Sequence, residues 1–167
     1  RDRESLTDID FTVKKGETIG IIGGTGSGKS SVVNLIPRFY DATKGSVQIE
    51  GKDVREYSLE ELRGKIGMVL QKAVLFKGTI LENMLWGNEN ATDEDIMQAL
   101  EVAQAKEFVD KKEGGLDFEI EQGGKNLSGG QRQRMTIARA VVKKPDILIL
   151  DDSACLLYTS DAADDGE

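Results

Sequence analysis

The chain has 167 residues, enough for one domain, and its 38% hydrophobic and 31% charged residues are typical of a globular protein, which excludes disordered and fibrous classes. A net charge of −8 argues against a general affinity for nucleic-acid phosphates, and one cysteine with no histidine rules out an intramolecular disulfide and nearly excludes a zinc site. The sequence lacks both an apolar run of the roughly 18 to 20 residues that span a membrane and a signal-peptide pattern, so we expect a soluble, cytosolic domain.

The first elements in chain order are an apolar run, a glycine-rich loop and a helix. Residues 19–22 are apolar apart from Gly20, which predicts a strand buried on both faces of a parallel sheet. A helix is expected over 30–39, ending or kinking near Pro37. A strand, a loop and a helix in this order are the setting that a phosphate-binding loop requires.

The loop itself has the pattern G-x4-G-K-S. Its glycines let the backbone wrap around a polyphosphate, while Lys29 would reach the β- and γ-phosphates and the Ser30 hydroxyl would ligate Mg²⁺. A chance glycine-rich turn would give this pattern on the order of one time in a hundred, and the flanking strand and helix lower that figure. The predicted nucleotide site consists of Gly23, Gly24, Thr25, Gly26, Ser27, Gly28, Lys29 and Ser30.

The rest of the chain alternates short strands and helices. A helix from Ser58 is predicted by its capping-box spacing to Glu61, and an amphipathic helix over 92–109 by its apolar spacing behind the N-cap Thr92. The other expected elements are strands at 47–49, 66–70 and 147–150, a glycine-rich loop at 113–126 and a helix at 131–142.

Asp151 directly follows the apolar strand expected at 147–150. A phosphate loop needs a carboxylate at the end of a neighbouring strand to hold magnesium, and Asp151 meets that need. The pattern is weak by itself, but together with the loop at 23–30 it predicts that Asp151 and Ser30 share the metal ion.

Between these two motifs lies a pentapeptide that resembles the signature of ABC ATPases, formed by Leu127, Ser128, Gly129, Gly130 and Gln131. A plain serine-capped helix would explain the serine but not all five residues. The resemblance covers about residues 5–153 and puts Gln71 in the place of the Q-loop glutamine, which serves as a metal ligand and in catalysis. It implies an α/β fold: a P-loop NTPase core with a mainly parallel sheet flanked by helices, a small antiparallel β portion and an inserted helical subdomain at about 79–140.

Within this family, residues 34–41 and 75–83 are similar to exporters whose membrane and ATPase domains are fused. The resemblance therefore implies an ATPase motor of a bacterial exporter at the cytoplasmic face of the cell membrane, with ATP as substrate and Mg²⁺ as cofactor. Its partners would be a transmembrane domain, expected upstream on the same chain, and a second nucleotide-binding domain, with each ATP held between one phosphate loop and the partner's signature. No nucleic-acid partner is expected. The alternatives are a soluble ABC ATPase of DNA repair or translation, and a nucleotide-binding half-site with negligible turnover.

Two residues depart from the pattern of the hydrolysing members. Asp152 stands where they have a glutamate that polarises the attacking water, and its shorter side chain predicts slow hydrolysis. Gln122 stands where exporters commonly have a glutamate. Both changes resemble the degenerate half of heterodimeric bacterial exporters, with ordinary drift in a homodimer as the alternative.

The two ends also depart from the family. Residues 154–167 resemble the translation of a sequencing adapter, so we expect a partial domain over 1–153 followed by a non-native tail. The aromatic residue that stacks on adenine is expected before Arg1, and the switch histidine is missing, so the domain is interpreted as truncated at both ends and weak in turnover by itself.

Overall fold

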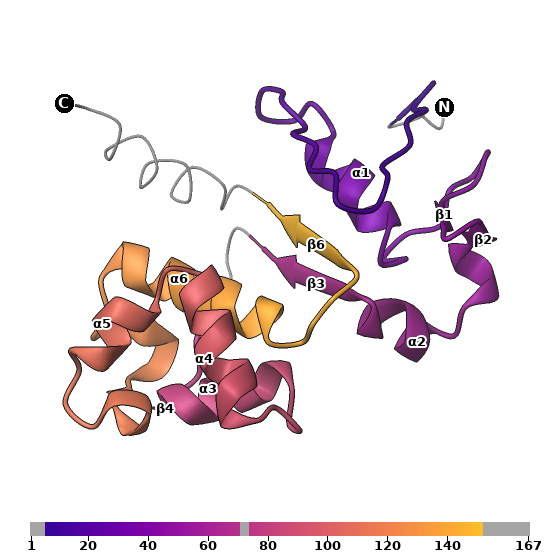
Figure 1. Ribbon diagram of the computed structural model, residues 1–167. Helices are drawn as coiled ribbons and strands as arrows, with labels where there is room; N and C mark the ends of the chain where they lie inside the picture. Colours follow the sequence, from indigo (N-terminus) through magenta and orange to yellow (C-terminus); the bar gives the residue numbers. More distant parts are fainter. Residues whose placement is uncertain (1–5, 71–73, 152–167) are drawn as a thin grey trace, which may run out of the picture. The chain divides into compact units, whose positions relative to one another are not determined.

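The computed structural model describes residues 6–70 and 74–151, and the chain divides into two compact units, Arg1–Arg63 and Gly64–Glu167 (Figure 1). The tail expected to be non-native, 154–167, lies outside the described residues. No helix in the described part of the chain is long and apolar enough to cross a membrane.

The first unit contains short elements only. They are α1 (Lys29–Leu35), β1 (Gln48–Ile49), β2 (Lys52–Asp53), the 3-10 turn η1 (Val54–Glu56) and α2 (Leu59–Gly64). The strands β1 and β2 form an antiparallel hairpin in which Ile49 pairs with Lys52. Its two-residue turn has positive φ at both positions, 54° at Glu50 and 76° at Gly51, which matches the right-handed twist of the strands.

The strand expected at 19–22 is not formed. These residues have neither helical nor strand structure, and Ile22 is 98% exposed. A strand of this kind needs a sheet whose hydrogen-bond ladder it can join and layers that cover both of its faces. Among the described residues of the first unit the only strand pairing is the β1–β2 hairpin, so the apolar run has no ladder to join.

The second unit contains a parallel strand pair and the helices that lie between its strands in sequence. Its elements are β3 (Ile66–Val69), β4 (Gly78–Thr79), α3 (Ile80–Gly87), α4 (Asp93–Val102), α5 (Lys106–Asp110), η2 (Gly115–Asp117), β5 (Glu119–Ile120), η3 (Gln122–Gly124), α6 (Gly129–Val141) and β6 (Ile147–Leu150). The strands β3 and β6 are parallel, whereas β4 and β5 are antiparallel. The mixture of a parallel core pair with small antiparallel pairs agrees with the expected α/β class.

Both ends of the β3–β6 pair are fixed by hydrogen bonds. At the start, Lys143 Nζ donates to the carbonyl of Ile66 at 3.0 Å, and at the end the Asp151 N–H donates to the carbonyl of Val69 at 2.9 Å. Gly67 makes a close approach possible, because a Cβ there would lie 2.8 Å from Cγ of Pro145. The strand register therefore brings Asp151 beside the end of β3.

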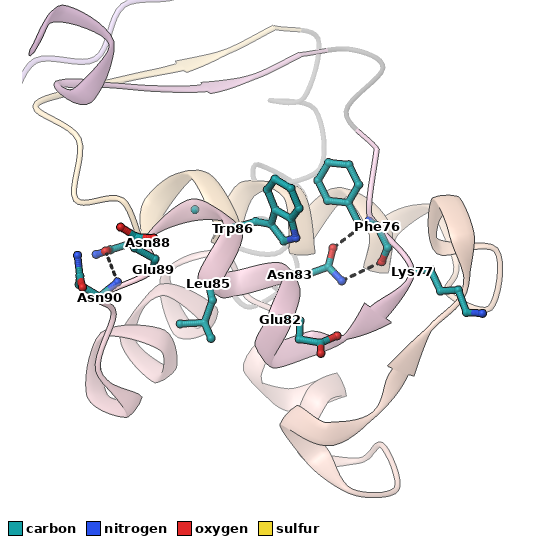
Figure 2. Close-up of a pocket in the computed structure, with 10 residues that line it drawn as sticks. Phe76, Lys77, Glu82, Asn83, Leu85, Trp86, Asn88, Glu89 and Asn90 are labelled. Atoms are coloured by element: carbon teal, nitrogen blue, oxygen red, sulfur yellow. Dashed lines mark hydrogen bonds between the residues drawn. The ribbon is translucent and has the colours of Figure 1, made fainter. Parts of the chain in front are cut away.

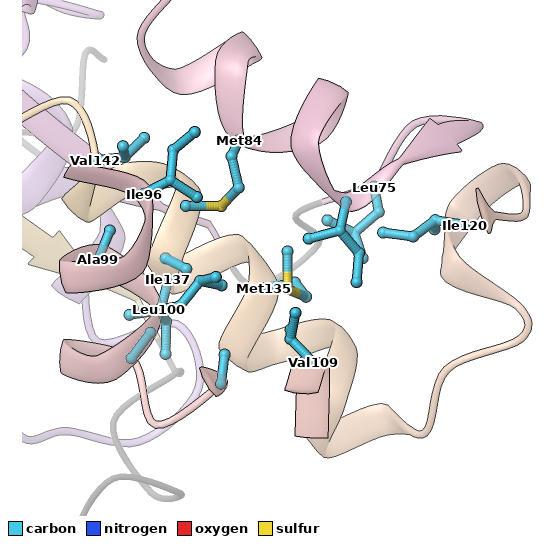
Figure 3. Packing of buried hydrophobic residues seen from close by; sticks show 14 of the residues in the cluster. Leu75, Met84, Ile96, Ala99, Leu100, Val109, Ile120, Met135, Ile137 and Val142 are labelled. Atoms are coloured by element: carbon cyan, nitrogen blue, oxygen red, sulfur yellow. The ribbon is translucent and has the colours of Figure 1, made fainter. Parts of the chain in front are cut away.

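The hydrophobic core of the second unit surrounds α6. Met84 of α3, Leu100 of α4 and Met135 of α6 are fully buried and face one another (Figure 3). The approach of α3 is so close that a side chain at Gly87 would collide with the carbonyl of Arg139. The helix that begins at the signature is therefore the one around which this unit packs.

Three helices of the second unit begin with a capping box. The N-cap hydroxyls of Thr79, Thr92 and Ser128 accept hydrogen bonds from the N3 backbone N–H of α3, α4 and α6 at 3.0, 3.2 and 3.1 Å. In each case the N3 side chain accepts from the N-cap N–H in return. The predicted cap at Thr92 is confirmed, and so is the Ser58–Glu61 pair that precedes α2.

The single helix expected over 92–109 is two helices. Gln104 has a φ of 58°, and the Ala105 N–H donates to the carbonyl of Leu100 at 2.7 Å, which ends α4 in a left-handed turn. The turn lets α5 start in a new direction with Ala105 and Val109 both buried. Apolar spacing alone does not reveal this break, because Ala103 keeps the helical period up to it.

Candidate functional site

The predicted phosphate loop is a compact turn that leads directly into α1. Gly26 and Gly28 have φ values of 79° and 93°, which residues with a Cβ atom rarely adopt. The Ser27 N–H donates to the carbonyl of Gly24 at 3.1 Å, and a Cβ at Gly23 would collide with the Ser27 side chain. Backbone conformation thus favours glycine at positions 26 and 28, and the close Ser27 side chain favours it at position 23.

Lys29 closes this loop. Its ammonium group donates to the carbonyls of Gly23 and Gly24, the latter at 3.1 Å, so the cation is held against the loop backbone. The first N–H groups of a helix lack intrahelical partners, and α1 begins at Lys29. The loop therefore presents a positive charge, with backbone donors beside it, to one small region.

The predicted metal ligands and catalytic residues are divided among the parts of the structure. Ser30 lies in the first turn of α1, whereas Asp151 is partly buried at the end of β6 in the second unit. Gln71 and Asp152 lie outside the described residues. The structure therefore brings residues 23–30 together within the first unit and describes Asp151 separately from them.

Magnesium would suit these oxygen ligands. No group of three or more Asp, Glu, Cys or His side chains is present in the described ranges, so a site made from protein carboxylates alone is not formed there. Mg²⁺ bound with a nucleotide uses only one or two protein oxygens beside phosphates and water. The Ser30 hydroxyl and the Asp151 carboxylate are donors of that kind.

The signature pentapeptide forms the N-terminus of α6. Leu127 is 5% exposed and fixes the segment in the core, whereas Ser128 and Gly129 are exposed. The Gln131 side chain accepts from the Ser128 N–H at 3.1 Å, so Gln131 serves the cap. What remains directed outward is a serine hydroxyl and the first N–H groups of a 13-residue helix, a combination that suits an anion.

Gln122, which stands where exporters commonly have a glutamate, lies in a turn between the first turns of α6 and Leu75. Gln122 is exposed at the start of η3, and the neighbouring Gly123 N–H donates to the carbonyl of Leu75 at 3.1 Å. A Cβ at Gly124 would lie 2.9 Å from the Arg132 side chain and 3.1 Å from Leu75. The turn therefore packs against both the chain after Gln71 and the first turns of α6.

The match to known families decides the assignment. The family model described as "ABC transporter" matches residues 6–154. The chain belongs to the ABC transporter family. The resemblance inferred from the signature is confirmed, and the chain is the ATP-binding domain of such a protein.

Two relatives with similar sequences are ABC transporter proteins about four times as long as this chain. YfiB of Bacillus subtilis, named as an ABC transporter ATP-binding protein, is 49% identical over 156 residues, which are 93% of this chain and 27% of YfiB. A Staphylococcus aureus protein, named provisionally as a multidrug export ATP-binding/permease protein, is 43% identical over 91% of this chain and 26% of its own length. This chain therefore spans about a quarter of these relatives.

A solved structure supports the ABC ATPase fold. A bacterial Atm1-family ABC exporter with ATP bound matches with a TM-score of 0.76 and 37% identity, covering 84% of this chain and 25% of the exporter chain. The α/β fold expected from the signature is thereby confirmed as the fold of an ABC exporter's ATPase domain.

The ABC domain also carries a groove that the sequence did not reveal. It has a volume of about 790 Å³, and Trp86, which is 70% exposed, stacks on Phe76 at its wall with ring centroids 4.7 Å apart (Figure 2). The other residues that line it are Lys77, Glu82, Asn83, Leu85, Gly87, Asn88, Glu89 and Asn90. A signal was available, since Trp86 is the only tryptophan of the chain and follows the exporter-like segment 75–83.

Proposed function

We propose that this chain is the motor domain of an ABC exporter, which binds ATP, hydrolyses it to ADP and phosphate, and drives export through a membrane domain. The observation that carries the proposal is the phosphate loop, in which two left-handed glycines direct the backbone and the Lys29 ammonium group lies over the carbonyls of Gly23 and Gly24. A triphosphate entering the loop would take over these contacts of Lys29 with its β- and γ-oxygens.

The metal site is a separate proposal, which rests on the sequence motifs and on the oxygen donors that they supply. We propose that Ser30 and Asp151, with Gln71, hold Mg²⁺, which supplies charge neutralisation of the phosphates when bound. The protein side chains fix the phosphates and the attacking water. Asp152 orients that water, but its side chain is one methylene shorter than that of glutamate. Its carboxylate therefore reaches the water less well, which predicts slow turnover.

The signature is proposed to act on a second nucleotide-binding domain. Ser128 and Gly129 are exposed at the start of α6, where a hydroxyl proton and backbone donors can bind the γ-phosphate held by a partner's loop. The signature pentapeptide is complete, whereas Asp152 replaces the glutamate of the hydrolysing members. We therefore propose a heterodimer in which the signature of this chain completes the productive site of its partner, while Asp152 belongs to the slow site.

The membrane domain is proposed to contact the groove at Phe76 and Trp86. A tryptophan that is 70% exposed beside a groove is typical of a protein contact, since such a ring would otherwise be partly buried. The relatives named as ATP-binding/permease proteins combine both functions in one chain. This contact would hold the domain at the cytoplasmic face of the membrane.

The test of the asymmetric motor is the change Asp152→Glu in the full-length transporter. We measure the ATP turnover of this variant alone and mixed with its partner subunit. Turnover at this site is expected to rise by about ten- to a hundredfold, because the longer side chain reaches the water. Unchanged turnover would show that Asp152 does not limit hydrolysis. A parallel Asp117→Glu exchange, at an exposed position in η2, makes the same chemical change outside the predicted site and should have no effect.

A further inference from the structure

Arg139, near the end of α6, joins the signature helix to the chain that follows Gln71. Its guanidinium group donates to the carbonyl of Val74 at 2.9 Å, and the plane of the same group lies 5.3 Å from the ring centre of Phe76. One side chain thus makes a hydrogen bond and a cation–π contact to two residues of a single short segment.

Phe76 is itself held firmly in place. The Asn83 side chain, 1% exposed, accepts from the Phe76 N–H at 3.0 Å and donates to its carbonyl at 2.9 Å (Figure 2). The Phe76 ring stacks on Trp86 at 4.7 Å. The groups are therefore connected in the order Arg139, Phe76, Trp86, from the signature helix to the wall of the groove.

The chemistry of Arg139 is costly for a purely structural role. One guanidinium nitrogen, Nη1, is buried and has no hydrogen-bond partner among the described residues, and desolvation lowers the pKa of the group. A buried donor without a partner destabilises the folded state, and an apolar side chain of similar volume would avoid that cost. Retaining arginine at this position is explained if its plane and charge serve the segment 74–76.

We propose that Arg139 is a positioning residue that couples the groove at Phe76 and Trp86 to the ATP-dependent state of the signature helix. The proposal rests on the proposed function, because it needs a partner in the groove and a nucleotide at the signature. Arg139 acts through Val74 and Phe76, and neither Arg139 nor Phe76 belongs to the phosphate loop or the signature pentapeptide. Replacing Arg139 should therefore change how the groove and the nucleotide site respond to each other more than it changes the affinity for ATP.

The kinetic test is a double-mutant cycle in the full-length transporter, with Mg-ATP as the only ligand. The variants are Arg139→Met, Trp86→Ala and the double variant. Each single change is expected to lower kcat about tenfold with KM within about twofold, and the double variant to fall no more than about twofold further. Losses that multiply, or a rise in KM that matches the fall in kcat, would overturn the proposal.

A matched control is available on the same helix. Arg134 also donates to a backbone carbonyl, that of Gln104 at 3.4 Å, but Gln104 does not belong to the segment 74–76 or to the groove. Arg134→Met should keep turnover near the parent value and combine additively with Trp86→Ala. The melting temperature of each variant separates loss of fold from loss of coupling. If Arg139→Met does not fold, Arg139→Lys keeps the charge but lacks the planar guanidinium group, and the same non-additive behaviour with Trp86→Ala is then expected.

A fluorescence measurement separates this proposal from the proposed function, since it needs ATP binding but no hydrolysis. The emission of Trp86 is isolated by subtracting the spectrum of Trp86→Phe, and its quenching by acrylamide is measured with and without Mg-ATP. A transporter that binds ATP without turnover would refute the motor function alone. ATP is expected to change the quenching of Trp86 in the parent and in Arg134→Met, but not in Arg139→Met. A change that persists in Arg139→Met, or is missing from the parent, would overturn the role of Arg139.

Discussion

The two units carry their functional residues in different ways. The phosphate loop of the first unit is shaped by its own backbone, through left-handed glycines and the carbonyls that Lys29 contacts, while the apolar residue Ile22 just before it stays 98% exposed. The signature of the second unit begins α6, whose residues Met135 to Ala138 are buried in the core. A nucleotide site can thus rest on local geometry in one unit and on packing in the other.

The largest expected effect compares the same kind of truncation in the two units. Leu100→Ala in the core of the second unit should lower the free energy of unfolding by about 2–5 kcal/mol, because it leaves a cavity beside α6. Ile22→Ala should change it by no more than about 0.5 kcal/mol, since that side chain is exposed. Denaturant unfolding of the full-length protein measures both. Equal losses would mean that the run at 19–22 is buried after all.

The next largest effect is expected in the first unit, and it concerns ATP turnover and not the free energy of unfolding. Lys29→Met should reduce ATP turnover by about a hundred- to a thousandfold, because the phosphate charge loses its positioned counter-charge. The melting temperature should hardly change, as Lys29 is outside any core. Lys15→Met removes a lysine of the same unit outside the loop and should leave turnover unaffected. Comparable losses in both variants would refute the role of the loop.

A smaller effect separates capping from nucleotide contact in the second unit. Ser128→Ala and Thr92→Ala each remove an N-cap of the same geometry, so each should cost about 1 kcal/mol of stability. Only Ser128→Ala should also lower the ATP turnover of the dimer, because Ser128 alone belongs to the signature. Turnover that falls equally in both would indicate that the cap, not phosphate contact, explains the role of Ser128.

The sequence was informative where a structure depends on neighbouring residues. Glycines with left-handed φ, the caps at Ser58 and Thr92, and the apolar strand that ends before Asp151 all follow from short-range patterns. It failed where the outcome depends on distant partners. The apolar run at 19–22 needs strands from elsewhere to become a strand, and the groove beside Trp86 arises from a ring stack across 10 residue positions that has no periodic signal.

The break at Gln104 is a failure of a third kind. The apolar period continues through Ala103, so a helix over 92–109 satisfies the pattern, but a left-handed residue lets α5 bury Val109 in a different direction. Burial of two separate apolar faces wins over the continuation of one helix. The roles of Gln71 and Asp152 stay predictions, because both lie outside the described residues.

The smallest expected effect is the acid sensitivity of α4. Lys144, which lies 2.6 Å from Asp95, and the cap at Thr92 together lower the pKa of Asp95 from 3.8 to about 2. A carboxylate with a lowered pKa contributes stability that is fully present above the unfolded value and is lost as the pH falls from about 4 towards 2. Asp95→Asn should therefore flatten the fall of the melting temperature over this pH range.

Asp93→Asn, in the same first turn, is the matched control for charge at the helix N-terminus and should leave most of the slope in place. Because the Lys144 side chain is 64% exposed, added salt should weaken the effect in the parent as well, and a slope that is insensitive both to salt and to Asp95→Asn would assign it to other carboxylates.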